Sequence, residues 1–114
     1  MKAPLEKDIQ FAFINLLRKC GFFVIRHNNV KITGKKTFVK MEDYEKGMPD
    51  IMTLYRGRWY CIEMKRPGGK LSIFQEQRKI EIDDNGGTYL IISSIKEGVD
   101  FINRVKTEYR QRCI

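Results

Sequence analysis

The feature that most constrains this chain is a pair of apolar, β-forming segments, residues 50–55 and 58–65, joined by Arg56-Gly57. Such a dipeptide between two strands predicts a tight two-residue hairpin turn, although arginine is not the preferred first residue of that turn. If the loop is centred on this dipeptide, counting back along both strands places Asp50 opposite Glu63. A three-residue loop would instead shift the register by one residue and separate the two acids.

The two acids and a lysine form a pattern with chemical meaning. Directly opposed strand residues have Cβ atoms about 5 Å apart, and Glu63 and Lys65 share one face of their strand because side chains alternate. Two carboxylates so close repel each other unless a divalent cation lies between them. Hard oxygen ligands favour Mg²⁺ or Mn²⁺ over zinc, and such an ion assists hydrolysis of a phosphodiester. The alternative is an ordinary Glu/Lys pair on an exposed strand.

Charge points to a polyanionic partner. The chain has 114 residues, enough for one domain covering 1–114, and its 22 Lys and Arg exceed its 14 Asp and Glu to give a net charge of +8. An excess of this size favours nucleic acid through long-range attraction and counterion release. A solvated surface that keeps the protein soluble is the other explanation. Charge alone does not tell whether a nucleic acid is cut or only bound.

The sequence also predicts a cellular environment. No apolar run approaches the length of a membrane span, and the first residues lack the apolar segment of a signal peptide. The three cysteines, Cys20, Cys61 and Cys113, are odd in number and form no CxxC pair, which favours reduced thiols over disulfides or zinc ligands. We therefore expect a soluble, cytoplasmic protein.

Hydrophobic periodicity and capping signals predict the remaining elements. In chain order we expect a helix over residues 4–20, a central strand over 22–25 covered on both faces, a basic hairpin or a mobile loop over 32–39, the hairpin described above, a helix from Ser72 to about Asn85, a buried strand over 88–92 and a helix with a capping box at Ser94 and Glu97. One antiparallel hairpin and one crossover helix predict an α/β fold with a central mixed sheet flanked by helices.

Three further polar residues each have two interpretations. Glu6 lies in the first turn of the first helix, where it either reaches a neighbouring cleft or only complements the helix dipole. Gln75 sits at the capping-box position of the helix that begins at Ser72, so capping explains it as well as a role in a site does. His27 is the only histidine, which excludes mechanisms that need two, and a lone histidine at a strand end is more often structural.

These motifs resemble a known family. Pro49-Asp50 followed after twelve residues by Glu63-Met64-Lys65 is similar to the PD-(D/E)XK nucleases, whose restriction-endonuclease-like core has the same element order, αβββαβ. The segments 47–50, 62–65 and 71–75, a glutamate in the first helix and the strand at 89–92 resemble more closely the VRR-NUC branch, which includes stand-alone proteins of phages and bacteria. Ile73 stands where many relatives have proline, and residues 29–45 match nothing in the family.

The resemblance implies a site and an activity. It assigns metal binding to Asp50, Glu63 and the main-chain carbonyl of Met64, assistance to the attacking water to Lys65, the outer part of the site to Glu6, and substrate or a metal-bound water to Gln75. The expected activity is that of a Mg²⁺- or Mn²⁺-dependent endodeoxyribonuclease, and small stand-alone members resemble Holliday junction resolvases, which implies a homodimer acting on branched DNA.

DNA contacts are expected from a further set of residues: Asn28, Lys35, Lys36, Arg66 and Lys70. Two competing interpretations remain open at this point. One is a non-catalytic nucleic-acid-binding module that keeps a nuclease-like fold. The other is a small basic RNA-binding protein of the ribosomal type, which explains the charge but not the opposition of two acids.

Overall fold

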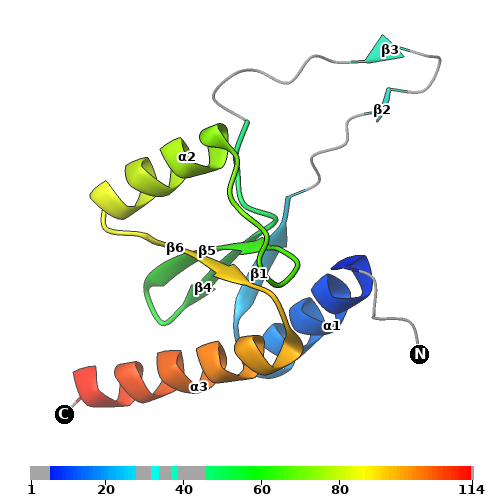
Figure 1. Ribbon diagram of the computed structural model, residues 1–114. Helices are drawn as coiled ribbons and strands as arrows, with labels where there is room; N and C mark the ends of the chain where they lie inside the picture. Colours follow the sequence, from blue (N-terminus) through cyan, green and yellow to red (C-terminus); the bar gives the residue numbers. More distant parts are fainter. Residues whose placement is uncertain (1–5, 28–31, 34–36, 39–45, 114) are drawn as a thin grey trace.

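The chain folds around a four-stranded mixed sheet with helices on both faces (Figure 1). The structure is a computed structural model, and it describes residues 6–27, 32–33, 37–38 and 46–113. The elements in chain order are α1 (Glu6–Lys19), β1 (Phe23–Arg26), β2 (Ile32–Thr33), β3 (Thr37–Phe38), β4 (Ile51–Tyr55), β5 (Arg58–Met64), α2 (Ile73–Asp84), β6 (Thr88–Ile92) and α3 (Ile95–Arg112). This is the α/β, restriction-endonuclease-like arrangement that the sequence predicts.

The sheet has the strand order β1-β4-β5-β6. The pairs β1–β4 and β4–β5 are antiparallel, whereas β5 and β6 are parallel and are joined by the crossover helix α2. Helices α1 and α3 pack together below the sheet in Figure 1, and α2 lies above it against β6. The mixed sheet therefore follows from one tight hairpin and one helical crossover, as expected.

The β4–β5 hairpin turns at the predicted dipeptide. Arg56 has φ 49° and Gly57 has φ 89°, so both residues are left-handed, as a two-residue turn of type I′ requires. The paired residues run from Tyr55 opposite Arg58 to Ile51 opposite Ile62. One step further, this register places Asp50 opposite Glu63. The loop therefore has two residues, the length that the predicted opposition of the two acids requires, and not three.

The hydrophobic core lies between the sheet and the pair α1 and α3. Its fully buried side chains come from both helices and from β4, β5 and β6: Phe13, Leu17, Ile51, Ile62, Met64, Ile92 and Val105. On β5 the core residues alternate with residues that face α2, Glu63 among them. The pleat of β5 therefore directs Glu63 away from the main core and toward α2.

The expectation of a central strand at residues 22–25 is wrong. β1 is an edge strand that pairs only with β4, and Phe23 and Ile25 are 57% and 44% exposed. Only the alternate residues Phe22 and Val24 are buried. A continuous apolar run predicts burial on both faces, but α2 packs over β6 and leaves the β1 side of that face uncovered. The strand at 88–92 is the opposite edge, and its Ile91 is 39% exposed.

Two smaller expectations have definite outcomes. β2 and β3 pair as an antiparallel two-stranded sheet, which agrees with the hairpin alternative for this segment, while residues 34–36 and 39 lie outside the described residues. Ser94 caps α3 by accepting from the Glu97 N–H at 3.1 Å, but the Glu97 carboxylate accepts from the Ser93 N–H at 2.8 Å, one residue earlier than a capping box requires.

No helix among the described residues is long and apolar enough to cross a membrane.

Candidate active site

Asp50 is held by backbone contacts on both sides. Its carbonyl accepts from the His27 N–H at 2.8 Å, which extends the β1–β4 pairing by one residue. Its own N–H donates to Glu63 Oε2 at 3.2 Å, and its Oδ2 accepts from the Met64 N–H at 2.9 Å. The main chain of Asp50 therefore binds the Glu63 carboxylate, and the Asp50 carboxylate binds the main chain of Met64, so the predicted opposition of Asp50 and Glu63 is held by two hydrogen bonds across the end of the hairpin.

Glu63 lies at the centre of the site. The residue is only 5% exposed, although a glutamate side chain in water is ionised at neutral pH. Its Oε1 accepts from Gln75 Nε2 at 2.8 Å, and Lys65 Nζ lies 3.9 Å from the same oxygen. The structure thus brings together Asp50, Glu63, Lys65 and Gln75, four of the residues that the sequence singled out.

Burial and repulsion shape the electrostatics of the acid pair. Burial, followed by the charge of Asp50, raises the pKa of Glu63 to about 8, while Lys65 opposes the rise. A cation held between the two carboxylates would reverse this effect by stabilising the ionised form. Their oxygens, together with the Met64 carbonyl, are hard donors of the kind that Mg²⁺ and Mn²⁺ take. Over the described part of the chain, which leaves out the side chain of Glu6, no group of three or more His, Cys, Asp or Glu side chains gathers at one point.

Gln75 makes the capping contacts that the sequence predicted and also contacts Glu63. Its side-chain oxygen accepts from the main-chain N–H of Ser72 at 2.8 Å, and its main-chain N–H donates to Ser72 Oγ at 3.2 Å. These two bonds complete the capping box of α2. The amide nitrogen of the same side chain remains free to donate to Glu63. One residue therefore starts the helix and fixes the central acid.

Gly47, which the sequence indicated only as part of the segment 47–50, and Arg78, which it did not indicate, lie where α2 meets the segment before Asp50. Gly47 has φ 80°, and a Cβ at this position would meet the main chain of Phe74 and lie 2.7 Å from the Gln75 nitrogen. Arg78 Nε donates to the Lys46 carbonyl at 3.1 Å. The glycine of the Gly47–Asp50 motif was an available signal for such a close approach. Arg78 had no signal, because its contact spans 32 residues.

Tyr89 is a third residue near the site that the sequence did not indicate. It is 3% exposed, and its hydroxyl has no hydrogen-bond partner among the described residues. Burial raises the pKa of this hydroxyl, and the charges of Glu63 and Asp50 raise it further, which places the ring near the acid pair. Tyr89 pairs with Cys61 and so faces the same side of the sheet as Glu63.

The remaining predicted residues are placed only in part. Glu6 begins α1, but its side chain lies outside what the structure describes. Asn28, Lys35 and Lys36 also lie outside the described residues. Arg66 and Lys70 are exposed in the turn that follows β5, beside the end of the strand that carries Glu63.

Comparison with known proteins bears on the fold. Among solved structures, a VRR_NUC domain matches this chain with a TM-score of 0.63 and 19% sequence identity, over 89% of this chain and 97% of that chain. The chain has the fold of a VRR_NUC domain. No family model matches the chain, and no curated protein matches it. The resemblance to VRR-NUC nucleases inferred from the motifs is therefore confirmed at the level of the fold.

Proposed function

We propose that this protein is a Mg²⁺- or Mn²⁺-dependent endodeoxyribonuclease whose site consists of Asp50, Glu63, Lys65 and Gln75. The observation that carries the proposal is the pair of half-buried Asp50 and buried Glu63, fixed across the hairpin with the Lys65 ammonium 3.9 Å from Glu63 Oε1. Two adjacent carboxylates and a lysine in a buried setting suit phosphodiester hydrolysis better than an exposed strand face. The VRR_NUC fold supports the same assignment.

Each residue has a distinct task in this proposal. Asp50, Glu63 and the Met64 carbonyl would hold the divalent ion, which when bound would supply charge neutralisation at the scissile phosphate and a more acidic water. Lys65 orients the attacking water and stabilises the negative charge that develops on the phosphate oxygens. Gln75 keeps the Glu63 carboxylate in place through the bond to Oε1.

DNA is the proposed substrate because of charge and position. The net charge of +8 attracts a polyanion, and the exposed Arg66 and Lys70 lie directly after the strand that ends at the site. The N-terminus of α2 adds the positive end of a helix dipole beside Glu63. A phosphate that approaches the acid pair therefore meets positive potential on this side.

We further propose a homodimer that acts on branched DNA. One chain of this size supplies one Asp50–Glu63 pair, whereas a junction must be cut in two strands. A symmetric dimer provides two sites related by a two-fold axis, which matches the symmetry of a four-way junction.

The proposal is tested by incubating the protein with four-way junction, flap, duplex and single-stranded DNA in Mn²⁺, Mg²⁺ or EDTA. We expect cleavage with either metal, preference for the branched substrates, and none in EDTA. Lys65→Ala should lower the cleavage rate about 100-fold or more, as loss of a group acting on the water does. Light scattering should give twice the monomer mass of 13.5 kDa.

Cleavage that persists in EDTA, or at full rate in Lys65→Ala, would overturn the mechanism. Tight DNA binding without cleavage of any substrate would instead favour the non-catalytic binding module. A monomer that cuts junctions at the wild-type rate would remove the dimer from the proposal and leave the chemistry standing.

A further inference from the structure

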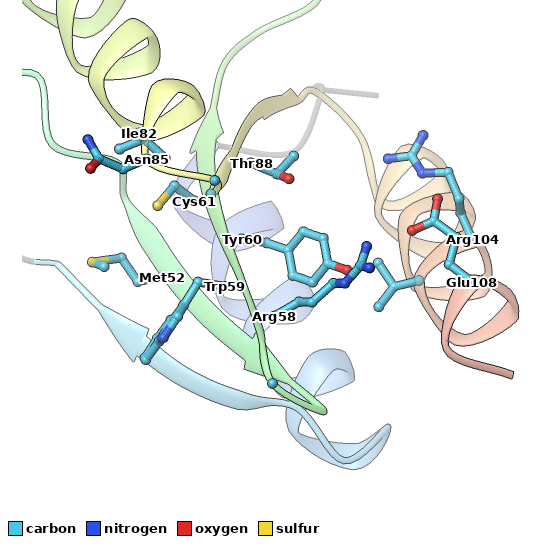
Figure 2. A pocket seen from close by; sticks show the side chains of 14 residues that line it. Met52, Arg58, Trp59, Tyr60, Cys61, Ile82, Asn85, Thr88, Arg104 and Glu108 are labelled. Carbon is cyan, nitrogen blue, oxygen red and sulfur yellow. The ribbon is translucent and has the colours of Figure 1, made fainter. Parts of the chain in front are cut away.

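A second surface that carries charged and aromatic side chains lies at the opposite end of the β4–β5 hairpin from the acid pair. A cavity of about 810 Å³ opens there between the start of β5, the turn after α2 and the middle of α3. We call it the hairpin-end cavity, and its polar and aromatic lining includes Arg58, Trp59, Tyr60, Asn85, Arg104 and Glu108 (Figure 2). Arg58 lies five positions from Glu63 along β5, roughly 17 Å at the usual rise per residue, so the end of the cavity that carries Arg58 is remote from the acid pair.

The cavity extends over an open part of the sheet edge. β6 begins with Thr88 opposite Tyr60, so Arg58 and Trp59 extend beyond their parallel neighbour. Figure 2 shows Trp59 on the side of β5 that carries Met52, and Arg58 and Tyr60 on the side that faces α3. A strand-like ligand that crosses this edge would therefore meet an aromatic ring on one side and arginines on the other.

Positive charge gathers on the α3 side of the cavity. Arg58, Arg104 and Arg112 all act on the Tyr60 hydroxyl: burial raises the pKa of Tyr60, the Glu108 carboxylate adds to the rise, and the three arginines lower it. None of these arginines takes part in an ion pair within the described part of the chain. Three arginines and one carboxylate thus act on the same hydroxyl, and this excess of positive charge favours an anionic ligand.

The arginines and Trp59 remain available for a ligand. Arg104 lies over the ring of Phe101 at 5.9 Å and Arg112 over that of Tyr109 at 5.5 Å, contacts that use the guanidinium face and leave its N–H donors free for phosphate oxygens. Trp59 is 42% exposed. Its ring meets Phe23 edge to face at 6.5 Å and 81°, so a part of the indole surface stays open for stacking.

We propose that the hairpin-end cavity binds a single-stranded segment of nucleic acid, with its phosphates on Arg58 and Arg104 and a base stacked on Trp59. Aromatic platforms beside a basic groove are the general means by which proteins hold unpaired strands. A cavity also suits an unpaired base better than it suits the convex surface of a duplex. The inference rests on the proposed function in one respect, that the polyanion which this protein meets is nucleic acid.

The chain offers a direct probe, because Trp59 is its only tryptophan. The full-length protein in EDTA is titrated with oligo-dT while tryptophan fluorescence is recorded, and we expect saturable quenching by the stacked base. A fully paired duplex of the same length should bind through phosphate contacts elsewhere and leave the fluorescence nearly unchanged. Trp59→Ala should weaken oligo-dT binding, measured by anisotropy, by about tenfold or more, which corresponds to loss of one stacked base, and Trp59→Phe should restore most of it.

A matched pair of charge reversals tests the arginines. Arg104, Glu108 and Arg112 are spaced by four along α3 and so lie on one stripe, whereas Arg110 is exposed on the other side of the helix. Arg104→Glu should weaken oligo-dT binding about tenfold and lower the slope of log K against log salt by about 0.7, the value for one phosphate contact on a single strand. Arg110→Glu changes the net charge equally and should alter binding less than twofold.

Other outcomes overturn the proposal. Equal weakening by the two reversals would show that diffuse charge binds the strand. Equal quenching by duplex and oligo-dT would assign the surface to paired DNA, and quenching by phosphatidylserine vesicles but not by DNA would assign it to a membrane surface. Lys65→Ala should quench like wild type, so binding that persists without cleavage separates failure of the nuclease proposal from failure of this one.

Discussion

Gln75 Nε2 donates to Glu63 Oε1 at 2.8 Å and so ties the first turn of α2 to the centre of the acid pair. The same side chain completes the capping box of the helix through Ser72. The start of α2 and the orientation of Glu63 are therefore coupled. A change at Gln75 disturbs both, whereas a change at Ser72 removes only the cap.

The first prediction separates these two roles. Gln75→Ala should lower DNA cleavage about 10- to 100-fold, the usual effect of removing a group that orients a metal ligand. Ser72→Ala should lower stability by about 1 kcal/mol through loss of the cap and leave cleavage within a fewfold of wild type. Cleavage rates under single-turnover conditions and Tm values measure the two effects. Equal loss of cleavage in both variants would mean that the cap, and not the Glu63 contact, governs the site.

The second prediction concerns pH and metal. In EDTA the folded protein keeps a proton on Glu63 up to its pKa of about 8, whereas the unfolded chain releases that proton near 4.5. The folded state therefore binds the extra proton between these values, so this contribution to stability is present at low pH and is lost as pH rises through the window. Glu63→Gln stays neutral, and its Tm should fall less over the same range.

Divalent metal should reverse the wild-type behaviour. At pH 8, Mn²⁺ at 100 times its Kd should add about 2.7 kcal/mol to the stability of the wild-type protein, an increase of several degrees in Tm. The same Mn²⁺ should leave the Tm of Glu63→Gln nearly unchanged. A wild-type Tm that does not respond to Mn²⁺ at any pH would contradict metal binding by the acid pair.

The third prediction uses two glycines with the same backbone angle. Gly47 and Gly68 both have φ 80°, but a Cβ on Gly47 would meet the backbone at the start of α2, while one on Gly68 would meet nothing within 4 Å. Gly68→Ala should cost only the left-handed strain of alanine, about 1 kcal/mol. Gly47→Ala should cost clearly more and should also reduce cleavage, because the displaced α2 carries Gln75. Denaturant unfolding and cleavage assays compare them, and equal stability losses would show that the close approach is absent.

The fourth prediction concerns the attachment of the edge strand. Thr53 is fully buried, and its hydroxyl donates to the Phe23 carbonyl at 2.8 Å, across the β1–β4 pair. Thr53→Val keeps the shape and removes this bond, so it should lower the free energy of unfolding by about 1 kcal/mol. Thr88→Val, at an exposed strand position, should change stability by less than about 0.5 kcal/mol. Chemical denaturation measures both, and equal effects would indicate that the buried hydroxyl bond contributes nothing.

Local signals in the sequence were enough for the hairpin and for the start of α2. The Arg56-Gly57 turn fixes the strand register because its length sets which residues face each other, and this register alone brings Asp50 to Glu63. The Ser72 and Gln75 capping box fixes where α2 begins, since both partners lie within one helical turn. These inferences succeed because the interactions that decide them join residues close in the chain.

What α2 covers was decided only by the tertiary structure. An apolar run of residues 22–25 predicts burial on both faces. In the structure β1 is an edge strand and α2 packs over β6 at the other edge, so Phe23 is exposed. The contact of Arg78 with the Lys46 carbonyl and the burial of Tyr89 near the acids likewise depend on where the crossover helix comes to rest. The sequence by itself determined the opposed acids through a two-residue turn, whereas the packing of distant segments, which no local pattern encodes, decided how Glu63 is buried and held.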